Sequence, residues 1–223
     1  MPKIISTKEI ELEIQKKSLI SQPLDLSGQI IEGIFLYNRK IDIEINLRSA
    51  IILNQISIEE VRFQKNVDLS NIIVKGSFLF SSNEVMGDLI LENANINGVV
   101  NLVGTSIKGS LFANNLKTKG FLSLTKVKIG GKVFLNNIKL EDSFLSGLII
   151  KGDGYFRDSL FSDDIEIKNG EIQGTIDFKN AFLKGKINLN NTKIFEYLIL
   201  DKNFLKENLI LENTQFKELI KNS

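Results

Sequence analysis

The stretch Ile96–Gly109, read INGVVNLVGTSIKG, contains the unit that the chain repeats. An apolar residue stands at place 0 of this unit, Gly at place 2, apolar residues at places 4 and 6, and in many copies Asn at place 8. Sixteen such units follow one another from Ile41, each eleven residues long except for the ten residues that begin at Leu140. Place 0 is apolar in 15 of the 16 units, whereas a composition with 43% hydrophobic residues gives about seven by chance. The repeat is therefore a property of the fold.

The alternation within each unit predicts strands. In Gly174-Thr175-Ile176-Asp177-Phe178 the apolar residues alternate with polar ones, which is the period of a β-strand. A period of eleven can also mark a right-handed helical supercoil. A helix would however lose about 1 kcal/mol for each Gly, and nine units carry Gly at place 2. We therefore expect an all-β chain of short strands and turns.

Strand-turn units of this kind cannot bury an apolar face alone, so they are expected to stack into a solenoid. Asn71, Asn93, Asn115 and Asn137 lie 22 residues apart, which predicts two units per coil and eight coils from Ile41 onward. Asn and Gly tolerate positive φ, so we expect both to mark tight corners. Stacked Asn side chains are also expected to form ladders along the axis. The residues that define the two columns are Gly76, Gly87, Gly98, Gly109, Gly120, Gly131, Gly152, Gly174 and Gly185, and Asn71, Asn93, Asn115, Asn137, Asn169, Asn180, Asn191 and Asn213.

Two half-coils carry a resemblance to a known family. They are Ile96-x-Gly98-x-Val100-x-Leu102-x-x-Thr105-x-Ile107-x-Gly109 and Ile172-x-Gly174-x-Ile176-x-Phe178-x-x-Ala181-x-Leu183-x-Gly185. Their pattern resembles that of the pentapeptide-repeat proteins, in the divergent branch written F-x-G-x-V-x-F-x-x-A-x-F. The resemblance covers about residues 20–216. It implies a right-handed quadrilateral β-helix and a binding or structural protein, and some members of the family are DNA-shaped inhibitors that protect topoisomerases.

The ends of an open solenoid need covers against end-to-end aggregation. Residues 1–22 are predicted to form an N-terminal cap, 23–216 the solenoid, and 217–223 a C-terminal cap or tail. Ser6 and Glu9 have the spacing of a capping box, which favours a short helix with Ile10 and Ile14 on one face. Ile10, Leu12 and Ile14 also alternate as in a strand, and the C-terminal segment could be a helical turn or a last strand.

The pattern breaks once, in the short unit that begins at Leu140. There Ser146 stands at an inward place, and in the next unit, from Ile150, Gly154 replaces a large apolar residue. A bulge here would offer a contact site. We favour a tolerated slip of the repeat that Phe144 and Phe156 fill.

Composition excludes several chemistries. The chain has no His and no Cys, so it lacks the residues of a His-based triad, a thiolate nucleophile or a usual zinc site. Asp153, between two glycines, supplies one carboxylate where calcium needs six to eight oxygens. No catalytic, cofactor-binding or metal-binding residue is therefore assigned.

A net charge of +1 argues against a nucleic-acid binder and against an acidic DNA mimic. No signal peptide or membrane span is predicted, and a cytoplasmic protein is expected.

Charged side chains provide the remaining candidates. The carboxylates are Asp142, Asp163, Glu196 and Glu207 at place 2 and the pairs Glu59–Glu60 and Asp163–Asp164. A glycosidase would need two of them facing each other, and two units per coil put Glu196 and Glu207 on opposite sides. A basic group runs through Lys117, Lys119, Lys126, Lys128 and Lys132. We expect both sets to be solvated surface charges, and inward Phe side chains to leave little aromatic surface for stacking bases.

The leading hypothesis is a non-enzymatic β-solenoid that serves as a rigid scaffold for another macromolecule, most simply a protein. The alternative is a carbohydrate-active or carbohydrate-binding β-helix that uses surface carboxylates. A DNA-mimic inhibitor is less favoured because of the net charge. A monomer or an end-to-end homodimer is expected, depending on how the C-terminal coil is covered.

Overall fold

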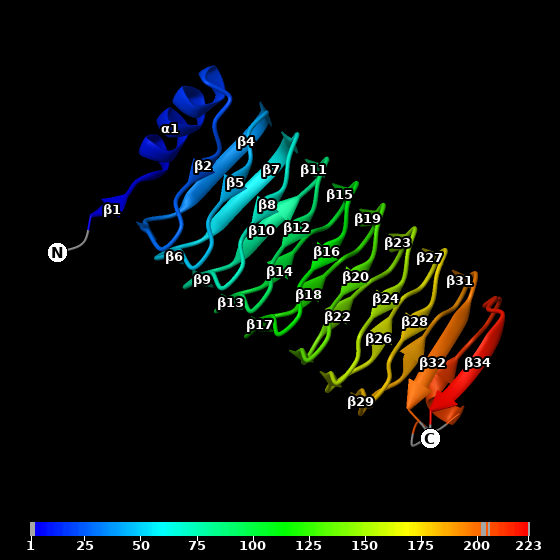
Figure 1. Cartoon of the computed structure of the whole chain (residues 1–223). Coiled ribbons are helices and arrows are strands. Elements are labelled where there is room, and N and C mark those ends of the chain that lie inside the picture. Colours follow the sequence, from blue (N-terminus) through cyan, green and yellow to red (C-terminus); the bar gives the residue numbers. More distant parts are fainter. Residues whose placement is uncertain (1–2, 202–203, 205, 223) are drawn as a thin grey trace.

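The computed structural model describes residues 3–201, 204 and 206–222. These residues form a solenoid of stacked parallel strands with one short helix at its N-terminal end (Figure 1). Each coil of the chain passes four sides of the solenoid, which we call side one to side four in the order in which the chain meets them. The predicted all-β solenoid is confirmed.

Side one is a nine-stranded parallel sheet, and side four is a ten-stranded parallel sheet. The strands of side one are β1 (Ile4–Ile5), β3 (Ile30–Ile31), β6 (Ile51–Ile52), β9 (Ile73–Val74), β13 (Asn95–Ile96), β17 (Lys117–Thr118), β21 (Lys139–Leu140), β25 (Leu160–Phe161) and β29 (Phe182–Leu183). The strands of side four are β2 (Leu24–Asp25), β5 (Ile45–Asn46), β8 (Val67–Asp68), β12 (Leu89–Ile90), β16 (Leu111–Phe112), β20 (Val133–Phe134), β24 (Gly154–Tyr155), β28 (Ile176–Asp177), β32 (Tyr197–Asp201) and β34 (Glu218–Asn222).

Sides two and three share one fifteen-stranded sheet, because the long strands β4 (Ile34–Ile41) and β7 (Ile56–Phe63) run along both. Side two continues with β10 (Phe78–Ser81), β14 (Val100–Asn101), β18 (Leu122–Ser123), β22 (Ser143–Phe144), β26 (Ile165–Glu166), β30 (Ile187–Asn188) and β33 (Leu209–Ile210). Side three continues with β11 (Glu84–Val85), β15 (Ser106–Ile107), β19 (Lys128–Ile129), β23 (Ile149–Ile150), β27 (Glu171–Ile172) and β31 (Lys193–Ile194). A 3-10 turn, η1 (Lys206–Asn208), precedes β33.

Neighbouring coils pair residue i with residue i+22 over most of the solenoid. Phe78 lies opposite Val100, and Val100 lies opposite Leu122. Two eleven-residue units per coil, as the Asn spacing predicts, are therefore confirmed. The ten strands of side four correspond to about ten turns. The eight coils counted from Ile41 are too few, because the strands that precede Ile41 already belong to the solenoid.

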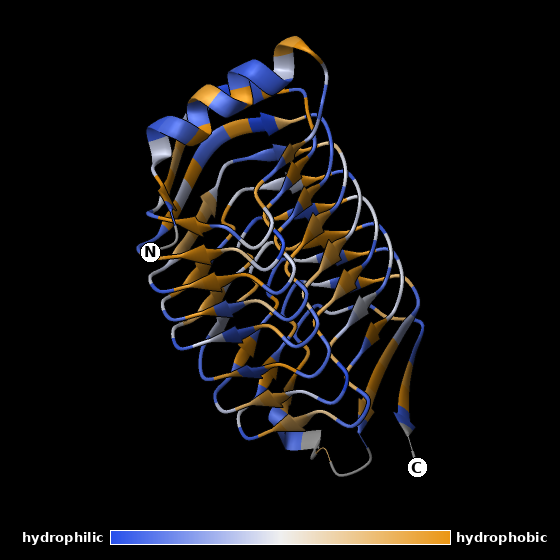
Figure 2. Ribbon diagram, turned by 60° about the vertical axis from the view of Figure 1, so that its left-hand side comes forward, coloured by the Kyte–Doolittle hydropathy of each residue, from blue (hydrophilic) through white to orange (hydrophobic). Residues whose placement is uncertain are grey.

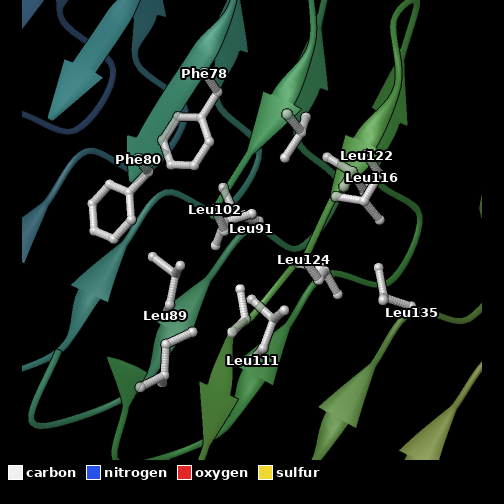
Figure 3. Packing of buried hydrophobic residues seen from close by; sticks show 14 of the residues in the cluster. Phe78, Phe80, Leu89, Leu91, Leu102, Leu111, Leu116, Leu122, Leu124 and Leu135 are labelled. Atoms are coloured by element: carbon white, nitrogen blue, oxygen red, sulfur yellow. The ribbon is translucent and has the colours of Figure 1, made fainter. Parts of the chain in front are cut away.

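The interior of the solenoid is a continuous column of aliphatic and aromatic side chains. Val100, Leu102 and Ile107, at places 4, 6 and 0 of consecutive units, are each at most 1% exposed. Figure 3 shows such side chains, among them Leu102 and Leu124, gathered between the strands. In Figure 2 the strands are mainly hydrophobic and the connecting corners mainly hydrophilic. Burial of this apolar surface is the main force that holds the coils together.

From Asn38 to Asn191, a left-handed residue recurs at steps of eleven, except for the step of ten from Asn137 to Gly147. All eight Asn residues at place 8 have φ between 53° and 57°. Their side chains also form ladders: Asn93 Nδ2 donates to Asn71 Oδ1 at 3.2 Å, and Asn115 Nδ2 donates to Asn93 Oδ1 at 2.9 Å. Both predictions for Asn are confirmed, because this residue tolerates the backbone conformation and its amide pairs with the coil below.

The column of glycines at place 2 has a different cause from the one we expected. The glycines with positive φ are Gly28, Gly104 and Gly147, and none of them is at place 2. A Cβ atom on Gly109 would collide with the Asp88 carboxylate and would lie 2.7 Å from the carbonyl oxygen of Gly87, one coil earlier. The place-2 glycines therefore permit close stacking of coils and do not serve the left-handed corner.

The two kinds of glycine predict opposite responses to substitution. Gly104→Asn should change the free energy of unfolding by less than about 1 kcal/mol, because Asn suits φ +70° and the nearest neighbour of a Cβ there, Ser82 Oγ, is 3.6 Å away. Gly109→Ala should destabilise the protein by about 1–3 kcal/mol, because the methyl group overpacks the contact with the preceding coil. Urea denaturation followed by circular dichroism measures both. Equal losses for the two variants would contradict the steric explanation.

The irregular segment keeps the strand pairing and loses one residue at a corner. Ser143, not Phe144, takes the inward place after Leu140 and is 5% exposed, and Leu145 takes the next one. The register changes from 22 to 21 residues at this point, and pairing continues on both sides of β22. The expected inward place of Ser146 is therefore wrong, because the residue is missing before the strand and not after it. The segment is a slip of the repeat and not a bulge.

Phe156 fills the space that the glycine leaves, as expected. A Cβ atom on Gly154 would lie 3.2 Å from the Phe156 ring and 3.3 Å from Ile150. The Phe156 ring is 1% exposed and stacks on Phe178 with a centroid distance of 5.0 Å. The same role expected of Phe144 is wrong, because this side chain points outward and is 45% exposed.

The two phenylalanines provide a matched test of this repair. Phe156→Ala should lower the free energy of unfolding by about 3–5 kcal/mol, because it leaves a cavity beside Gly154. Phe144→Ala removes an equal volume from the surface, and we expect it to cost less than about 1 kcal/mol. Thermal and urea denaturation measure the difference. An unchanged melting transition for Phe156→Ala would show that the interior does not depend on this ring.

The helix α1 (Thr7–Leu19) covers the N-terminal end of the interior, where its Ile10 and Ile14 are buried. The capping box is complete, since Ser6 Oγ accepts from the Glu9 N–H and the Glu9 carboxylate accepts from the Ser6 N–H. The Lys3 ammonium, 2.8 Å from the Glu9 carboxylate, and these bonds to Ser6 lower the pKa of Glu9 to about 2. The predicted helix is confirmed and the alternative strand over Ile10–Ile14 is wrong.

The C-terminal segment adds a strand. β34 pairs in parallel with β32 over five residues, from Tyr197 opposite Glu218 to Asp201 opposite Asn222. This pairing resolves the choice between a helical turn and a strand that the sequence left open. At the other end, β1 pairs with β3, so the solenoid begins ahead of the capping helix.

Candidate interaction faces

Sides two and three of the solenoid present opposite charges. The two outward columns of side three, from β7 to β31, hold five basic and two acidic residues, namely Arg62, Lys108, Lys128, Lys151 and Lys193 against Glu84 and Glu171. The outward columns of side two hold five acidic and two basic residues, namely Glu59, Asp142, Asp164, Glu166 and Glu212 against Lys168 and Lys186. The net charge of +1 therefore hides a separation of charge between adjacent sides.

The basic side contains a hollow over β15, β19 and β23, three adjacent strands. Its volume is about 500 Å³, and its lining residues are Ser106, Ile107, Lys108, Lys128, Ile129, Gly130, Ile149 and Lys151. Gly130 lies between Lys108 and Lys151 along the column and leaves the space open. Of the three lysines, Lys108 makes a 3.7 Å ion pair with Glu84. We call Lys108, Lys128 and Lys151 the lysine triad.

Side four carries a strip of stacked rings that the sequence analysis did not anticipate. Phe112 and Phe134 stack with a centroid distance of 5.1 Å and an interplanar angle of 6°, and Phe134 and Tyr155 stack at 5.2 Å and 20°. The Arg157 guanidinium covers the Tyr155 ring at 4.8 Å. The ring faces are thus largely occupied by each other and by Arg157, so mainly their edges remain for a ligand. The expectation that Phe side chains point inward is wrong here, although these faces do not suit the stacking of a base or a sugar.

Asp–Arg pairs lie in the same column beyond both ends of the aromatic strip. Asp177 lies directly next to Tyr155 at one end, and Asp68 lies two coils before Phe112, past Ile90, at the other. Arg48 lies 2.7 Å from Asp68, and Arg157 lies 2.6 Å from Asp177, and both aspartates are buried. Burial raises the pKa of Asp68, but hydrogen bonds from Ser70 and Arg48 outweigh it and hold the pKa below its usual range. These ion pairs hold both carboxylates in place as structural groups of side four.

The predicted carboxylates do not meet in one site. Glu196 lies 3.3 Å from Lys217, between sides three and four, whereas Glu207 lies in η1 ahead of side two. Asp164 accepts from the Lys186 N–H of the next coil at 2.7 Å. Asp142 lies one coil before Asp164 at the start of side two, whereas Glu59 and Glu60 lie on an earlier coil. All of these carboxylates and Asp163 are exposed, which agrees with the expectation of solvated charges.

Asp153 is held by the protein's own groups. Its carboxylate accepts from the Tyr155 hydroxyl at 2.9 Å and from the Thr175 N–H at 3.0 Å, and it lies 2.9 Å from the Lys132 ammonium. Burial raises the pKa of Asp153, and the bonds from Thr175, Lys132 and Tyr155 lower it to a greater extent. Among the described residues, no group of three or more Asp, Glu, His or Cys side chains could hold a metal ion.

The predicted basic group does not form one patch. Lys117 and Lys119 are on side one, Lys126 is at a corner with φ 57°, Lys128 is on side three, and Lys132 borders side four. One coil carries all five around its circumference. The basic hollow instead forms from residues 20 or more positions apart, which only the 22-residue register brings together.

Comparisons of the chain with protein-family models, with curated proteins and with solved structures found no match. In the part of the chain that is described, no helix is long and apolar enough to span a membrane.

Proposed function

We propose that the protein is a non-enzymatic β-solenoid of the pentapeptide-repeat kind, a rigid scaffold whose sides bind another protein. The observation that carries this proposal is the separation of charge between side two and side three in a chain with a net charge of +1. Complementary charge on a flat surface selects partners and steers their approach.

The regular stacking supports a scaffold role. Coils in fixed register hold outward side chains in straight columns, as the Asn71–Asn93–Asn115 ladder shows for one corner. A repeat protein of this type contacts only its neighbouring coils and offers extended surfaces for binding. The four-sided coil also supports the proposed relationship to pentapeptide-repeat proteins.

The surroundings of the carboxylates favour binding over catalysis. A glycosidase needs one carboxyl group with a raised pKa opposite a second carboxylate. Asp153 is neutralised by Lys132, and Glu196 is paired with Lys217. Burial does raise the pKa of Glu92, yet its carboxylate accepts from the Asn114 amide at 2.8 Å and forms part of a second polar ladder.

A cross-linking scan tests the scaffold role. A photoreactive phenylalanine analogue would replace Lys139 on side one, Phe144 on side two, Gln173 on side three or Lys179 on side four, in a lysate of the cells that make the protein. We expect one defined adduct from one or two sides and none from the others, because a specific partner covers a limited area. Absence of a defined adduct from every side, together with turnover of a polysaccharide by the purified protein, would contradict the proposal.

A further inference from the structure

The lysine triad on side three concentrates positive charge. Lys128 is the first residue of β19, and Lys108 and Lys151 follow β15 and β23, so the three side chains leave consecutive coils. All three are exposed. Within the described residues, Lys128 and Lys151 take part in no ion pair, and the one partner of Lys108, Glu84, is shared with Arg62. Like charges held this close repel one another, and a bound anion relieves that repulsion.

A hollow on side one differs in its lining from the hollow on side three. Side one also has a hollow, of about 610 Å³, with Lys117 and Lys139 in its lining. Its lining includes Asp158, which supplies a carboxylate from the protein itself. The hollow on side three has no carboxylate among its lining residues, and it includes Ile149, which lies next to Lys128 in the column and two residues before Lys151. Side three therefore suits an anionic ligand with some apolar character better than side one does.

Acidic residues bound the triad at both ends. Along the column, Glu84 on β11 stands one coil before Ser106, and Glu171 on β27 stands one coil after Ile149. The cationic region is thus three coils long, or about 10 Å between the outer lysine-bearing strands. A long polyanion lying along this side would meet Glu84 and Glu171. A nucleic acid would also require more phosphate contacts than three lysines provide.

We propose that side three binds a short acidic segment of a partner protein, with two or three carboxylates on the lysine triad and an apolar side chain against Ile149. This proposal rests on the proposed scaffold function and names the side and the chemistry of the partner. An extended segment places alternate side chains about 6.6–7 Å apart on one face, so two carboxylates at alternate positions fit within the roughly 10 Å between the outer lysine-bearing strands. Lysine side chains are long and flexible enough to adjust to them.

Defined peptides test the proposal. The probe is a fluorescent peptide with three glutamates and one valine at consecutive alternate positions, so that all four side chains share one face of the extended segment. The control peptide has glutamine in place of each glutamate. Fluorescence anisotropy at low and at physiological salt would give the affinities. We expect binding of the glutamate peptide that weakens with salt, and at least tenfold weaker binding of the glutamine peptide.

Two triple variants with the same change in net charge locate the site. Lys108→Gln, Lys128→Gln and Lys151→Gln together should weaken binding at least tenfold. Lys117→Gln, Lys119→Gln and Lys139→Gln together, on side one, should leave binding within about twofold. Circular dichroism and urea denaturation of both variants would show that the solenoid is intact.

Three results would overturn the proposal. They are failure of the glutamate peptide to bind the unmodified protein, an equal loss of affinity in the two folded triple variants, and tighter binding of a single-stranded oligonucleotide than of the glutamate peptide. A cross-linked partner on another side, with no peptide binding on side three, would leave the scaffold function standing and reject only the acidic segment.

Discussion

The left-handed corner at every eleventh residue is the constraint on which the structure depends. Asn115, with φ 57°, and its equivalents turn the chain from one side of the solenoid to the next at the same place in each unit. Because the corners recur at equal intervals, each coil closes after two units and the next coil begins directly above it. The straight columns of apolar side chains, the Asn ladders and the columns of surface charge all follow from that interval. A residue lost at a corner, as before Ser143, changes the register by one and leaves the inward places intact.

Local sequence patterns were sufficient for the elements. The alternation of Ile176 and Phe178 with polar neighbours predicted a strand with two inward side chains, and the spacing of Ser6 and Glu9 predicted the capping helix. The position of the missing residue was not predictable in this way. From alternation alone, the two inward residues of this strand could be either Ser143 and Leu145 or Phe144 and Ser146. Only the pairing with the preceding coil, in which Ser143 lies opposite Leu122, selects Ser143 and Leu145. For the same reason the role of Gly109 became clear only from the backbone one coil away.

The outward surface was harder to predict because its residues meet across coils. Phe112, Phe134 and Tyr155 occupy place 5 of alternate units, with steps of 22 and 21 residues, so place 5 of the repeat predicts their stack. The lysine triad crosses two columns and lies on both sides of the short unit, so no single spacing identifies it. Net charge was a poor guide, since a value of +1 is compatible with strong local separation. The function of a solenoid therefore depends more on which residues share a column or a side than on the composition of the whole chain.

The spacing of the coils can be measured directly in solution. The chain has no cysteine, so a cysteine in place of Arg62 and another in place of Lys193 would carry two spin labels at unique positions. These residues lie in one outward column, six coils apart. Stacked strands then predict a narrow distance distribution centred near about 29 Å. A broad distribution, or a centre displaced by more than about 8 Å after allowance for the labels, would contradict the continuous 22-residue stacking.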